Sequence, residues 1–248
     1  MFKLFSKSKK EVASKSDFSV LKTDMHSHLI PGIDDGSPDM ATSLKLISGM
    51  SELGFSKLIT TPHIMWDMYK NSREIILEKL EVLRGEVAKN NIPVEINAAA
   101  EYFLDDHVEE LLKDGKPLLT ISGNKVLVEF SLAHMPFSLK DILFEMQMQG
   151  YQPVIAHPER YIYMEGNKAF YDELKSIGCL FQLNLLSLGN YYGRSVHELA
   201  QHLIKKSYYD IVGTDLHHFR HLDALHGPGL QAQLQKLLDS GKLINDKL

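Results

Sequence analysis

Short apolar runs alternate with helical stretches along most of this chain, and almost every apolar run ends in a histidine or a carboxylate. Seven runs have the apolar, β-branched character of strands: 20–23, 57–61, 94–99, 125–128, 152–156, 179–183 and 210–212. Five stretches between them repeat apolar residues with a helical period: 39–53, 72–89, 139–149, 168–176 and 195–206. Strands that alternate with helices predict an α/β fold with a parallel sheet, closed here as a TIM-like barrel.

The polar residues at the strand ends comprise five histidines and four carboxylates. They are His26, His28, Asp35, His63, Glu101, Glu129, His157, Asp215 and His217. The carboxyl ends of the strands build the active face of such barrels, so we expect these side chains to meet at one mouth. In a strand-like segment, His26 and His28 point to the same side, as Asp215 and His217 do. The set predicts a polynuclear metal site.

Imidazole and carboxylate ligands without a thiolate favour manganese, iron or zinc over calcium. Such ions lower the pKa of bound water and stabilise the oxygens of an in-line displacement. Three divalent ions would outweigh the four carboxylates in charge and attract a phosphate group. Arg160 and Arg220 each follow a predicted ligand closely in the sequence and can bind the remaining phosphate oxygens. We therefore expect phosphate ester hydrolysis.

A few further polar residues are candidates for supporting roles. Asp24 and Asp34 can orient neighbouring ligands, although each can equally be a turn or cap residue. Asn184, at the end of the sixth predicted strand, is a weaker candidate for a polar contact. Among the histidines outside the ligand set, His218 and His221 are the most plausible additions to the site.

Composition excludes several classes of protein. The chain has 248 residues and a net charge of −5, which does not favour general nucleic-acid binding. A single cysteine, Cys179, excludes an intramolecular disulfide and fits a reducing compartment, so a cytoplasmic location is expected. Leu185 stands where a Cys-x5-Arg phosphatase loop would need arginine, which excludes that thiol chemistry. Apolar runs are too short for a transmembrane segment.

Residues 1–19 are expected to form a lysine-rich tail, and residues 20–248 a single catalytic domain. Five lysines stand in the first fifteen residues against Glu11 alone. Phe2, Leu4 and Phe5 beside them could make weak contact with an anionic membrane surface. A solvated tail is the preferred interpretation.

Several segments together resemble the PHP (polymerase and histidinol phosphatase) superfamily. They are Asp24-Met-His-Ser-His28, Pro31-Gly-Ile-Asp-Asp-Gly36, Thr61-Pro-His63, Glu101, Glu129, His157-Pro-Glu-Arg-Tyr161 and Asp215-x-His217. The resemblance covers about residues 22–225 and is closer to the bacterial PHP-type protein tyrosine phosphatases of capsule and exopolysaccharide operons. It implies a distorted (βα)7 barrel, three divalent ions, usually manganese, and a phosphotyrosine protein as substrate. That substrate would be the tyrosine-rich tail of a membrane-bound bacterial kinase.

The resemblance also implies a role for each matching residue. One ion would be held by His26, His28, Glu101 and Asp215, a second by Glu101, Glu129 and His157, and a third by Asp35, His63 and His217. Arg160 and Arg220 would bind phosphate, and His63 would also act directly in catalysis. A metal-bridging hydroxide would attack phosphorus in line, without a phosphoenzyme.

Two other functions remain open at this point. A PHP phosphoesterase for a small phosphate such as histidinol phosphate would use the same metals and differ only in its pocket. A non-catalytic binding module would keep the metals for stability alone. Aromatic side chains in two loops, among them Tyr69 and Tyr192, can stack on a phosphotyrosine ring or merely pack on the barrel.

Overall fold

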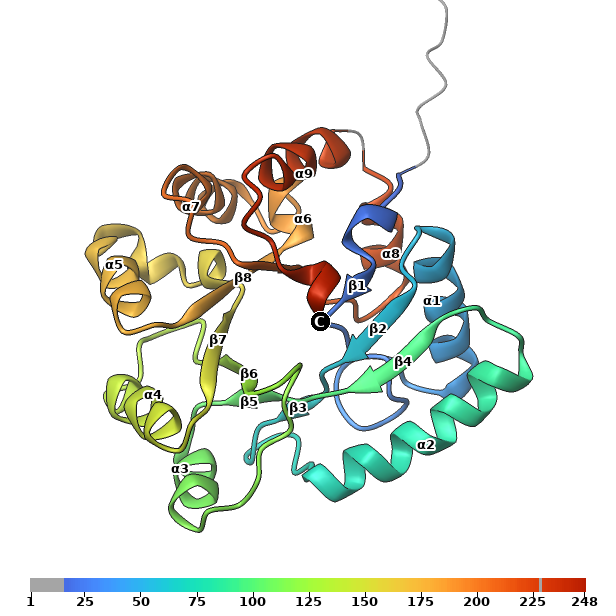
Figure 1. Ribbon diagram of the computed structural model, residues 1–248, viewed down its shortest axis with the longest axis horizontal. Coiled ribbons are helices and arrows are strands. Elements are labelled where there is room, and N and C mark those ends of the chain that lie inside the picture. Colours follow the sequence, from blue (N-terminus) through green and yellow to red (C-terminus); the bar gives the residue numbers. More distant parts are fainter. Residues whose placement is uncertain (1–15, 228) are drawn as a thin grey trace, which may run out of the picture.

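The computed structural model describes residues 16–227 and 229–248, in which strands alternate with helices. The strands are β1 (Thr23–Asp24), β2 (Lys57–Thr60), β3 (His63–Ile64), β4 (Glu95–Ala98), β5 (Glu101–Phe103), β6 (Lys125–Glu129), β7 (Gln152–Ala156), β8 (Leu180–Asn184) and β9 (Ile211–Gly213). The α-helices are α1 (Met40–Glu52), α2 (Arg73–Lys89), α3 (Asp106–Lys113), α4 (Leu139–Met148), α5 (Ala169–Ser176), α6 (Leu185–Leu188), α7 (Arg194–Lys205), α8 (Phe219–Leu225) and α9 (Leu230–Leu238). Short 3-10 helices are η1 (Ser19–Leu21), η2 (Pro158–Arg160), η3 (Ile162–Gly166) and η4 (Asn245–Lys247). Figure 1 shows the strands in the middle of the molecule with the long helices outside them.

The strands pair in parallel and form two sheets, with orders β1-β2-β4 and β3-β5-β6-β7-β8-β9. Two residues separate β2 from β3, and two separate β4 from β5, so each pair continues one path. An isolated parallel bridge joins Ser27 to Leu216, where the His28 N–H donates to the Leu216 carbonyl at 2.9 Å. This bridge joins the segment after β1 to the segment after β9, and thereby one sheet to the other. The predicted α/β fold with parallel pairing is confirmed.

Buried apolar side chains lie on both faces of the strands. A smaller cluster consists of strand and loop residues, namely Met25, Ile59, Ala99, Ile121, Leu127, Val154, Ala156 and Ile211. A larger cluster contains the strand residues that face the helices. Along β6 the two alternate: Leu127 belongs to the smaller cluster, whereas Val126 and Val128 belong to the larger. Burial on both faces explains why the strands are apolar without a break.

Side-chain caps fix where several helices begin. The carboxylate of Asp39 accepts from the N–H of Thr42 at 2.8 Å at the start of α1. Ser72 and Asp105 cap α2 and α3 in the same manner. Such caps satisfy amide groups that have no partner within the helix. The loop that ends in the cap of α1 carries His26, His28 and Asp35, three of the predicted ligands.

The C-terminal segment closes the end of the strands opposite the predicted ligands. The amide of Asn245 donates to the carbonyls of Thr23 and Val212, at 3.1 and 2.7 Å, and its side-chain oxygen accepts from the Val212 N–H at 3.0 Å. Ile244 and Leu248 pack against the smaller apolar cluster. In Figure 1 the C-terminus accordingly lies near the centre of the molecule, beside β1.

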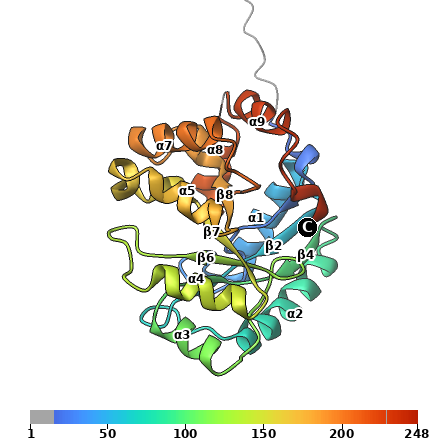
Figure 2. The same ribbon diagram turned by 60° about the vertical axis from the view of Figure 1, so that its left-hand side comes forward.

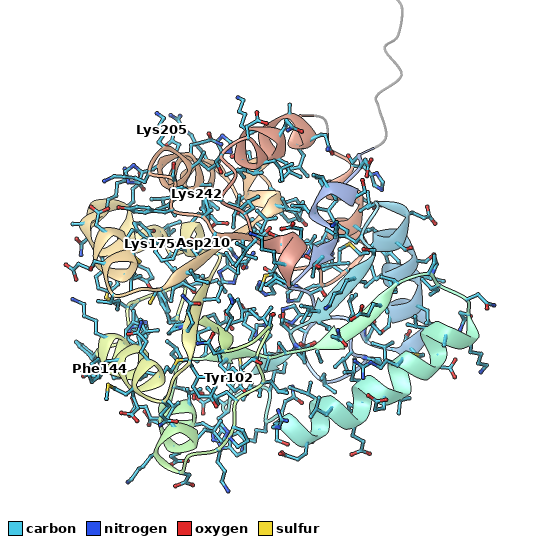
Figure 3. The ribbon with its side chains drawn as sticks, in the orientation of Figure 1. Tyr102, Phe144, Lys175, Lys205, Asp210 and Lys242 are labelled. Atoms are coloured by element: carbon cyan, nitrogen blue, oxygen red, sulfur yellow. The ribbon has the colours of Figure 1, made fainter. Side chains whose placement is uncertain are left out.

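The helices α1 to α5 and α7 follow one another around the outside in chain order (Figure 1). Figure 2, turned toward one side, shows α3, α4, α5 and α7 in succession. Figure 3 labels one ion pair between this layer and the strands, formed by Lys175 of α5 and Asp210, the residue that directly precedes β9 in the sequence. The Lys175 ammonium lies 2.6 Å from the Asp210 carboxylate, which also accepts from the N–H of Phe181 at 2.8 Å.

The predicted elements differ from the observed ones in three ways. The strand predicted at 20–23 is wrong over its first residues, since 19–21 form the 3-10 helix η1 and Val20 is exposed. The strands expected at 57–61 and 94–99 are each followed by a short second strand, so seven predicted runs become nine strands. The helices α3, α6, α8 and α9 were not predicted. The five predicted helices are confirmed within two residues of their expected bounds.

Most of the predicted lysine-rich tail lies outside the described residues. Within its last part, the Phe18 side chain is fully buried and its N–H donates to the Leu53 carbonyl at 2.7 Å. Packing against the fold therefore begins ahead of residue 20. In residues 16–227 and 229–248, no helix combines the length and the apolar character needed to span a membrane.

Candidate metal centre

The structure brings the nine predicted ligands to one end of the strands. His26 and His28 follow β1, Asp35 lies before α1, His63 opens β3, Glu101 opens β5, Glu129 ends β6, His157 follows β7, and Asp215 and His217 follow β9. Seven of them line a cavity of about 560 Å³. His26 and His28 are fully buried and contact the cavity-lining carboxylates of Glu101 and Asp215.

The first group of donors consists of His26, His28, Glu101 and Asp215. The Nε2 atoms of His26 and His28 lie 3.1 and 3.3 Å from Oε2 of Glu101. The same two nitrogens lie 3.3 and 3.4 Å from Oδ1 of Asp215. One donor atom from each of the four residues lies within 4.8 Å of the others. Four donors that converge on one point match the coordination number of a divalent ion bound by imidazole and carboxylate.

A second group shares Glu101. Nδ1 of His63 lies 3.0 Å from Oε1 of Glu129 and 3.3 Å from Oε2 of Glu101, and these three residues can reach one ion. On the other side of Glu101, its Oε1 lies 3.2 Å from Nε2 of His157. Oε2 of Glu101 therefore faces His26, His28 and His63, whereas its Oε1 faces His157.

A third group lies nearer the solvent. Oδ1 of Asp35 lies 3.4 Å from Nε2 of His63 and 3.6 Å from Nε2 of His217. Together with His28 these residues can surround one ion. The Asp35 side chain is about half exposed, whereas the first group is buried, so the centre extends from the interior to the cavity surface.

Residues behind the donors set their orientation. Oδ2 of Asp34 lies 2.8 Å from Nδ1 of His28, and its Oδ1 accepts from the N–H of Gly36 at 3.0 Å, so Asp34 has both the orienting role and the turn role considered from the sequence. Asp24 instead binds the N–H and hydroxyl of Thr214, at 2.8 and 2.9 Å, and so fixes the backbone next to Asp215. Hydrogen bonds of this kind determine the tautomer and direction of a metal ligand.

Gln182 is a supporting residue that the sequence analysis missed. Its Oε1 lies 2.9 Å from Nδ1 of His26 and accepts from the backbone N–H of His157 at 3.2 Å. Gln182 is fully buried in the middle of β8. A polar residue in the middle of an otherwise apolar strand was the available signal, because such a residue needs a buried partner.

The backbone is constrained at two of the predicted ligands. His157 and Asp215 have φ angles of 31° and 52°, in the left-handed region that residues other than glycine seldom adopt. Gly36 ends the Asp-Asp-Gly turn, and a Cβ there would lie 2.3 Å from the His28 carbonyl oxygen. Strained or crowded backbone of this kind persists where the surrounding structure holds a functional geometry in place.

The donor set fits divalent metal ions. Nδ1 of His63, Oε1 of Glu101 and Nδ1 of His157 are buried and have no hydrogen-bond partner among the described residues. Burial alone would lower the pKa of His26, but the carboxylates of Glu101 and Asp215 raise it to about 9. Burial would likewise raise the pKa of Glu101, but His26 and His157 hold it well below its usual range. Ligation satisfies such groups without protons.

Of the two predicted phosphate-binding arginines, one lies at the cavity. Arg160 lines it, and its Nη1 donates to Oδ2 of Asp215 at 2.8 Å. Arg220 is exposed on α8 and is not among the residues that line the cavity. The structure thus brings Arg160 together with the ligands and leaves Arg220 apart from them.

Other side chains complete the wall of the cavity. Asn184, the weaker candidate, donates to Oδ2 of Asp215 at 3.1 Å. His218 and His221 both line the cavity, as does Tyr192. The apolar part of the wall is formed by Met65, Met68, Tyr69, Phe103, Phe130 and Leu132. The loop after β6, which supplies Phe130 to Ala133, was not singled out from the sequence, since it contains no ligand candidate.

Comparison with known proteins places this fold and site in context. The chain is 29% identical over 198 residues to tyrosine-protein phosphatase YwqE of Bacillus subtilis, covering 79% of this chain and 78% of that protein. It is also 29% identical over 204 residues to tyrosine-protein phosphatase CpsB of Streptococcus agalactiae, covering 78% and 82%. A lactonase from Listeria monocytogenes, at 11% identity and a TM-score of 0.53, shares the fold alone.

A solved structure is similar over most of its length. Its description reads "Crystal structures of YwqE from Bacillus subtilis and CpsB from Streptococcus pneumoniae, unique metal-dependent tyrosine phosphatases". The TM-score is 0.77 at 26% identity, with 88% of this chain and 86% of that chain covered. The family model described as "Capsular polysaccharide synthesis, CpsB/CapC" matches residues 22–233, which include every ligand candidate and Arg160. The chain therefore belongs to the CpsB/CapC family of capsular polysaccharide synthesis proteins.

Proposed function

We propose that this protein is a metal-dependent phosphatase that hydrolyses phosphotyrosine in proteins. The observation that carries the proposal is the convergence of five imidazoles and four carboxylates at one end of the strands, where seven of them line one cavity, with a partly buried arginine–carboxylate pair beside them. The relatives of the same family are named tyrosine-protein phosphatases, and the similar solved structure is described as metal-dependent.

Three divalent ions, manganese by preference, are the cofactor that we propose. His26, His28, Glu101 and Asp215 would hold the first, Glu101, Glu129 and His157 the second, and Asp35, His63 and His217 the third. The distances within the first group support it most directly. Nδ1 of His63 also lies 3.0 Å from Oε1 of Glu129, so His63 lies between the residues proposed for the second ion and those proposed for the third. When bound, such ions lower the pKa of coordinated water and neutralise charge on phosphate oxygens.

Arg160 is the residue that we propose for binding the phosphate group. Its guanidinium is tied through Nη1 to Asp215, while Nε and Nη2 have no hydrogen bond among the described residues. These N–H groups are available to phosphate oxygens at the cavity, and guanidinium binds such oxygens in pairs. Arg220, being exposed on α8, would reach the phosphate only after a change in conformation, and its role stays a prediction.

The wall of the cavity supports an aromatic phosphate ester. Tyr69 lies parallel to the ring of His63, with ring centres 5.6 Å apart, and Met65 and Phe130 lie in the same wall. Apolar and aromatic side chains around a charged floor favour a substrate with a flat apolar body and a charged end. Phosphotyrosine has this form, whereas phosphoserine and small polar phosphates do not.

The finer features of the fold and setting are proposals of the same kind. We take the strands as a distorted (βα)7 barrel in which β2 with β3, and β4 with β5, count as single strands. Residues 20–248 would form one catalytic domain preceded by the tail. The partner would be the tyrosine-rich tail of a bacterial kinase that regulates capsule or exopolysaccharide synthesis, and the location would be the cytoplasm.

The first experiment measures phosphate release by chelator-stripped protein with and without added manganese. The substrates are a phosphotyrosine peptide, a phosphoserine peptide and histidinol phosphate. Manganese-restored activity confined to phosphotyrosine supports the proposal. Preference for histidinol phosphate would contradict the protein substrate, and no turnover with any metal would leave a non-catalytic binding module.

Two substitutions test the assigned roles. His157→Ala should lower kcat by at least about 100-fold with little loss of fold, since it removes a ligand. Arg160→Ala should mainly raise KM, by roughly ten- to a hundredfold, since it removes charged hydrogen bonds to phosphate. Arg194→Ala removes an exposed arginine paired with Glu198 and serves as the control. Full activity in either of the first two variants would contradict the site.

A further inference from the structure

We infer that Tyr192 is a positioning residue, which holds the Arg160 guanidinium at the angle needed to bind the phosphate of the substrate. Tyr192 lies between α6 and α7 and lines the cavity. The inference rests on the proposed function, because it assigns to Arg160 the phosphate group of the substrate. It concerns a residue that belongs to neither the ligand set nor the arginines.

Arg160 is held by two contacts of different kinds. Its Nη1 donates to Oδ2 of Asp215 at 2.8 Å, which fixes one corner of the guanidinium. Its Cζ lies 4.7 Å from the centre of the Tyr192 ring, within the range of a cation–π contact, which restrains the group at a second point. One hydrogen bond alone leaves a guanidinium free to rotate about that bond. The ring contact removes this freedom.

The Tyr192 side chain is itself held by a hydrogen bond from Asn184. Its hydroxyl accepts from Nδ2 of Asn184 at 3.1 Å, and the same nitrogen donates to Oδ2 of Asp215 at 3.1 Å. Oδ1 of Asn184 accepts from the N–H of Leu186 at 2.9 Å, at the start of α6. The ring, the arginine and the ligand Asp215 are therefore joined through one asparagine that the backbone of α6 holds in place.

The two carboxylate oxygens of Asp215 have different partners. Oδ1 faces the imidazoles of His26 and His28, at 3.3 and 3.4 Å, while Oδ2 receives Arg160 and Asn184. The arginine is thus anchored to a ligand carboxylate without occupying the oxygen that faces the proposed ion. Tyr192 then directs the remaining N–H groups of Arg160 toward the cavity that both residues line.

Two variants separate the ring of Tyr192 from its hydroxyl. Tyr192→Phe keeps the ring under Arg160 and should leave KM and kcat within about twofold of the starting protein. Tyr192→Leu removes the ring and should raise KM for a phosphotyrosine peptide by roughly 3- to 20-fold, the factor expected from loss of a cation–π contact. Its kcat should change much less. The inhibition constant of inorganic phosphate should rise in parallel with KM.

A double-mutant cycle shows whether Tyr192 acts through Arg160. In a protein that already carries Arg160→Met, adding Tyr192→Leu should cause little further rise in KM. Tyr208→Leu is the matched control, since Tyr208 is also half-buried and its hydroxyl also binds a side chain, that of Asp172. This control should change neither KM nor phosphate inhibition. Melting temperatures of all variants identify losses that come from unfolding.

Three results would overturn the inference. They are an unchanged KM in Tyr192→Leu, an equal loss in Tyr192→Phe, and full additivity with Arg160→Met. A failure of the proposed function is distinguishable, because it appears in the unsubstituted protein as absent phosphotyrosine hydrolysis. Binding of inorganic phosphate to the manganese-loaded protein, measured by calorimetry, then still compares Tyr192→Leu with Tyr192→Phe. Equal phosphate affinity in these two variants would contradict the positioning role.

Discussion

Gly213, the last residue of β9, leaves no room for a methyl group beside His26, a proposed ligand. A Cβ at this position would lie 2.7 Å from Cβ of His26 and 2.9 Å from Nε2 of Gln182. Gly213→Ala should therefore displace His26 and destabilise the protein by about 1–3 kcal/mol, the usual cost of overpacking. Manganese affinity, measured by calorimetry, should fall with it.

The control for this substitution is available in α2. A Cβ at Gly85 would meet no atom within 4 Å. Gly85→Ala should stabilise the protein by about 0.5–1 kcal/mol, because alanine favours the helix, and should leave manganese affinity unchanged. Equal manganese affinity in Gly213→Ala and the parent would show that the ligands tolerate the displacement.

Gln182 offers a second test at a single residue. Its Oε1 is positioned to accept the proton on Nδ1 of His26, which leaves Nε2 unprotonated and able to bind an ion. Gln182→Met keeps the volume and removes the acceptor, so manganese affinity should fall by about 10- to 100-fold. Gln201→Met, which breaks only a bond to Gln233, should leave the affinity unchanged. The prediction fails if both variants bind manganese alike.

The predictability of the site differs from residue to residue. Glu101 and Glu129 could be found from sequence because a carboxylate after a buried apolar run needs a compensating charge. Tyr192 was only one of several loop aromatics, and nothing in the sequence connects it to Arg160, 32 positions away. Arg220 follows the motif closely in sequence, yet it lies on α8, is exposed and does not line the cavity, which the sequence does not reveal.

At the scale of elements, one buried carboxylate connects η2, α6 and the segment before β9. Oε1 of Glu159 accepts from the N–H of Asn184 at 3.0 Å and from the hydroxyl of Ser187 at 2.8 Å. Its Oε2 accepts from the hydroxyl of Tyr209 at 2.9 Å. Burial raises the pKa of this carboxyl, while Ser187 and other donors oppose the rise.

Loss of the Glu159 carboxylate should loosen all three elements. Glu159→Ala would leave three buried donors without an acceptor, so the free energy of unfolding should fall by about 3–5 kcal/mol. Denaturant titration measures the change. Glu165→Ala, at an exposed position of η3, should stay within about 0.5 kcal/mol of the parent. A loss below about 1 kcal/mol in Glu159→Ala would mean that water replaces the carboxylate.

The elements themselves were predictable where periodicity was long and caps were present. The helices α1 and α2 begin at Asp39 and Ser72, residues whose capping role is legible in the sequence. The short helix α6 cannot be predicted from the sequence, because its four residues are all buried leucine or serine and continue the apolar run of β8. The breaks after β2 and β4 also escape prediction. At these breaks the N–H of Ala99 donates to the Thr60 carbonyl and the N–H of Glu101 to the Pro62 carbonyl, and such contacts between distant segments cannot be read from the sequence.

At the scale of the whole molecule, the metal centre links stability to pH. In the metal-free protein the pKa of His26 is raised to about 9 and that of His28 well above its usual value, in both cases against the effect of burial and by neighbouring carboxylates. When the pKa of a histidine is higher in the folded than in the unfolded protein, where it is near 6.5, protonation of that histidine stabilises the fold. The whole of this stabilisation is present below about pH 6.5. This contribution is lost as pH rises through about 9.

Manganese should reverse this dependence. Ligation requires neutral imidazoles, so each ion displaces protons and binds more tightly as pH rises. The rise in melting temperature on adding manganese should therefore be larger near pH 8.5 than near pH 6.5, by roughly 5–10 °C at saturating metal. Scanning calorimetry of stripped and loaded protein at both pH values measures it, with magnesium, which prefers oxygen ligands, as the control. Equal manganese shifts at both pH values would mean that these imidazoles are not the groups from which the ion displaces protons.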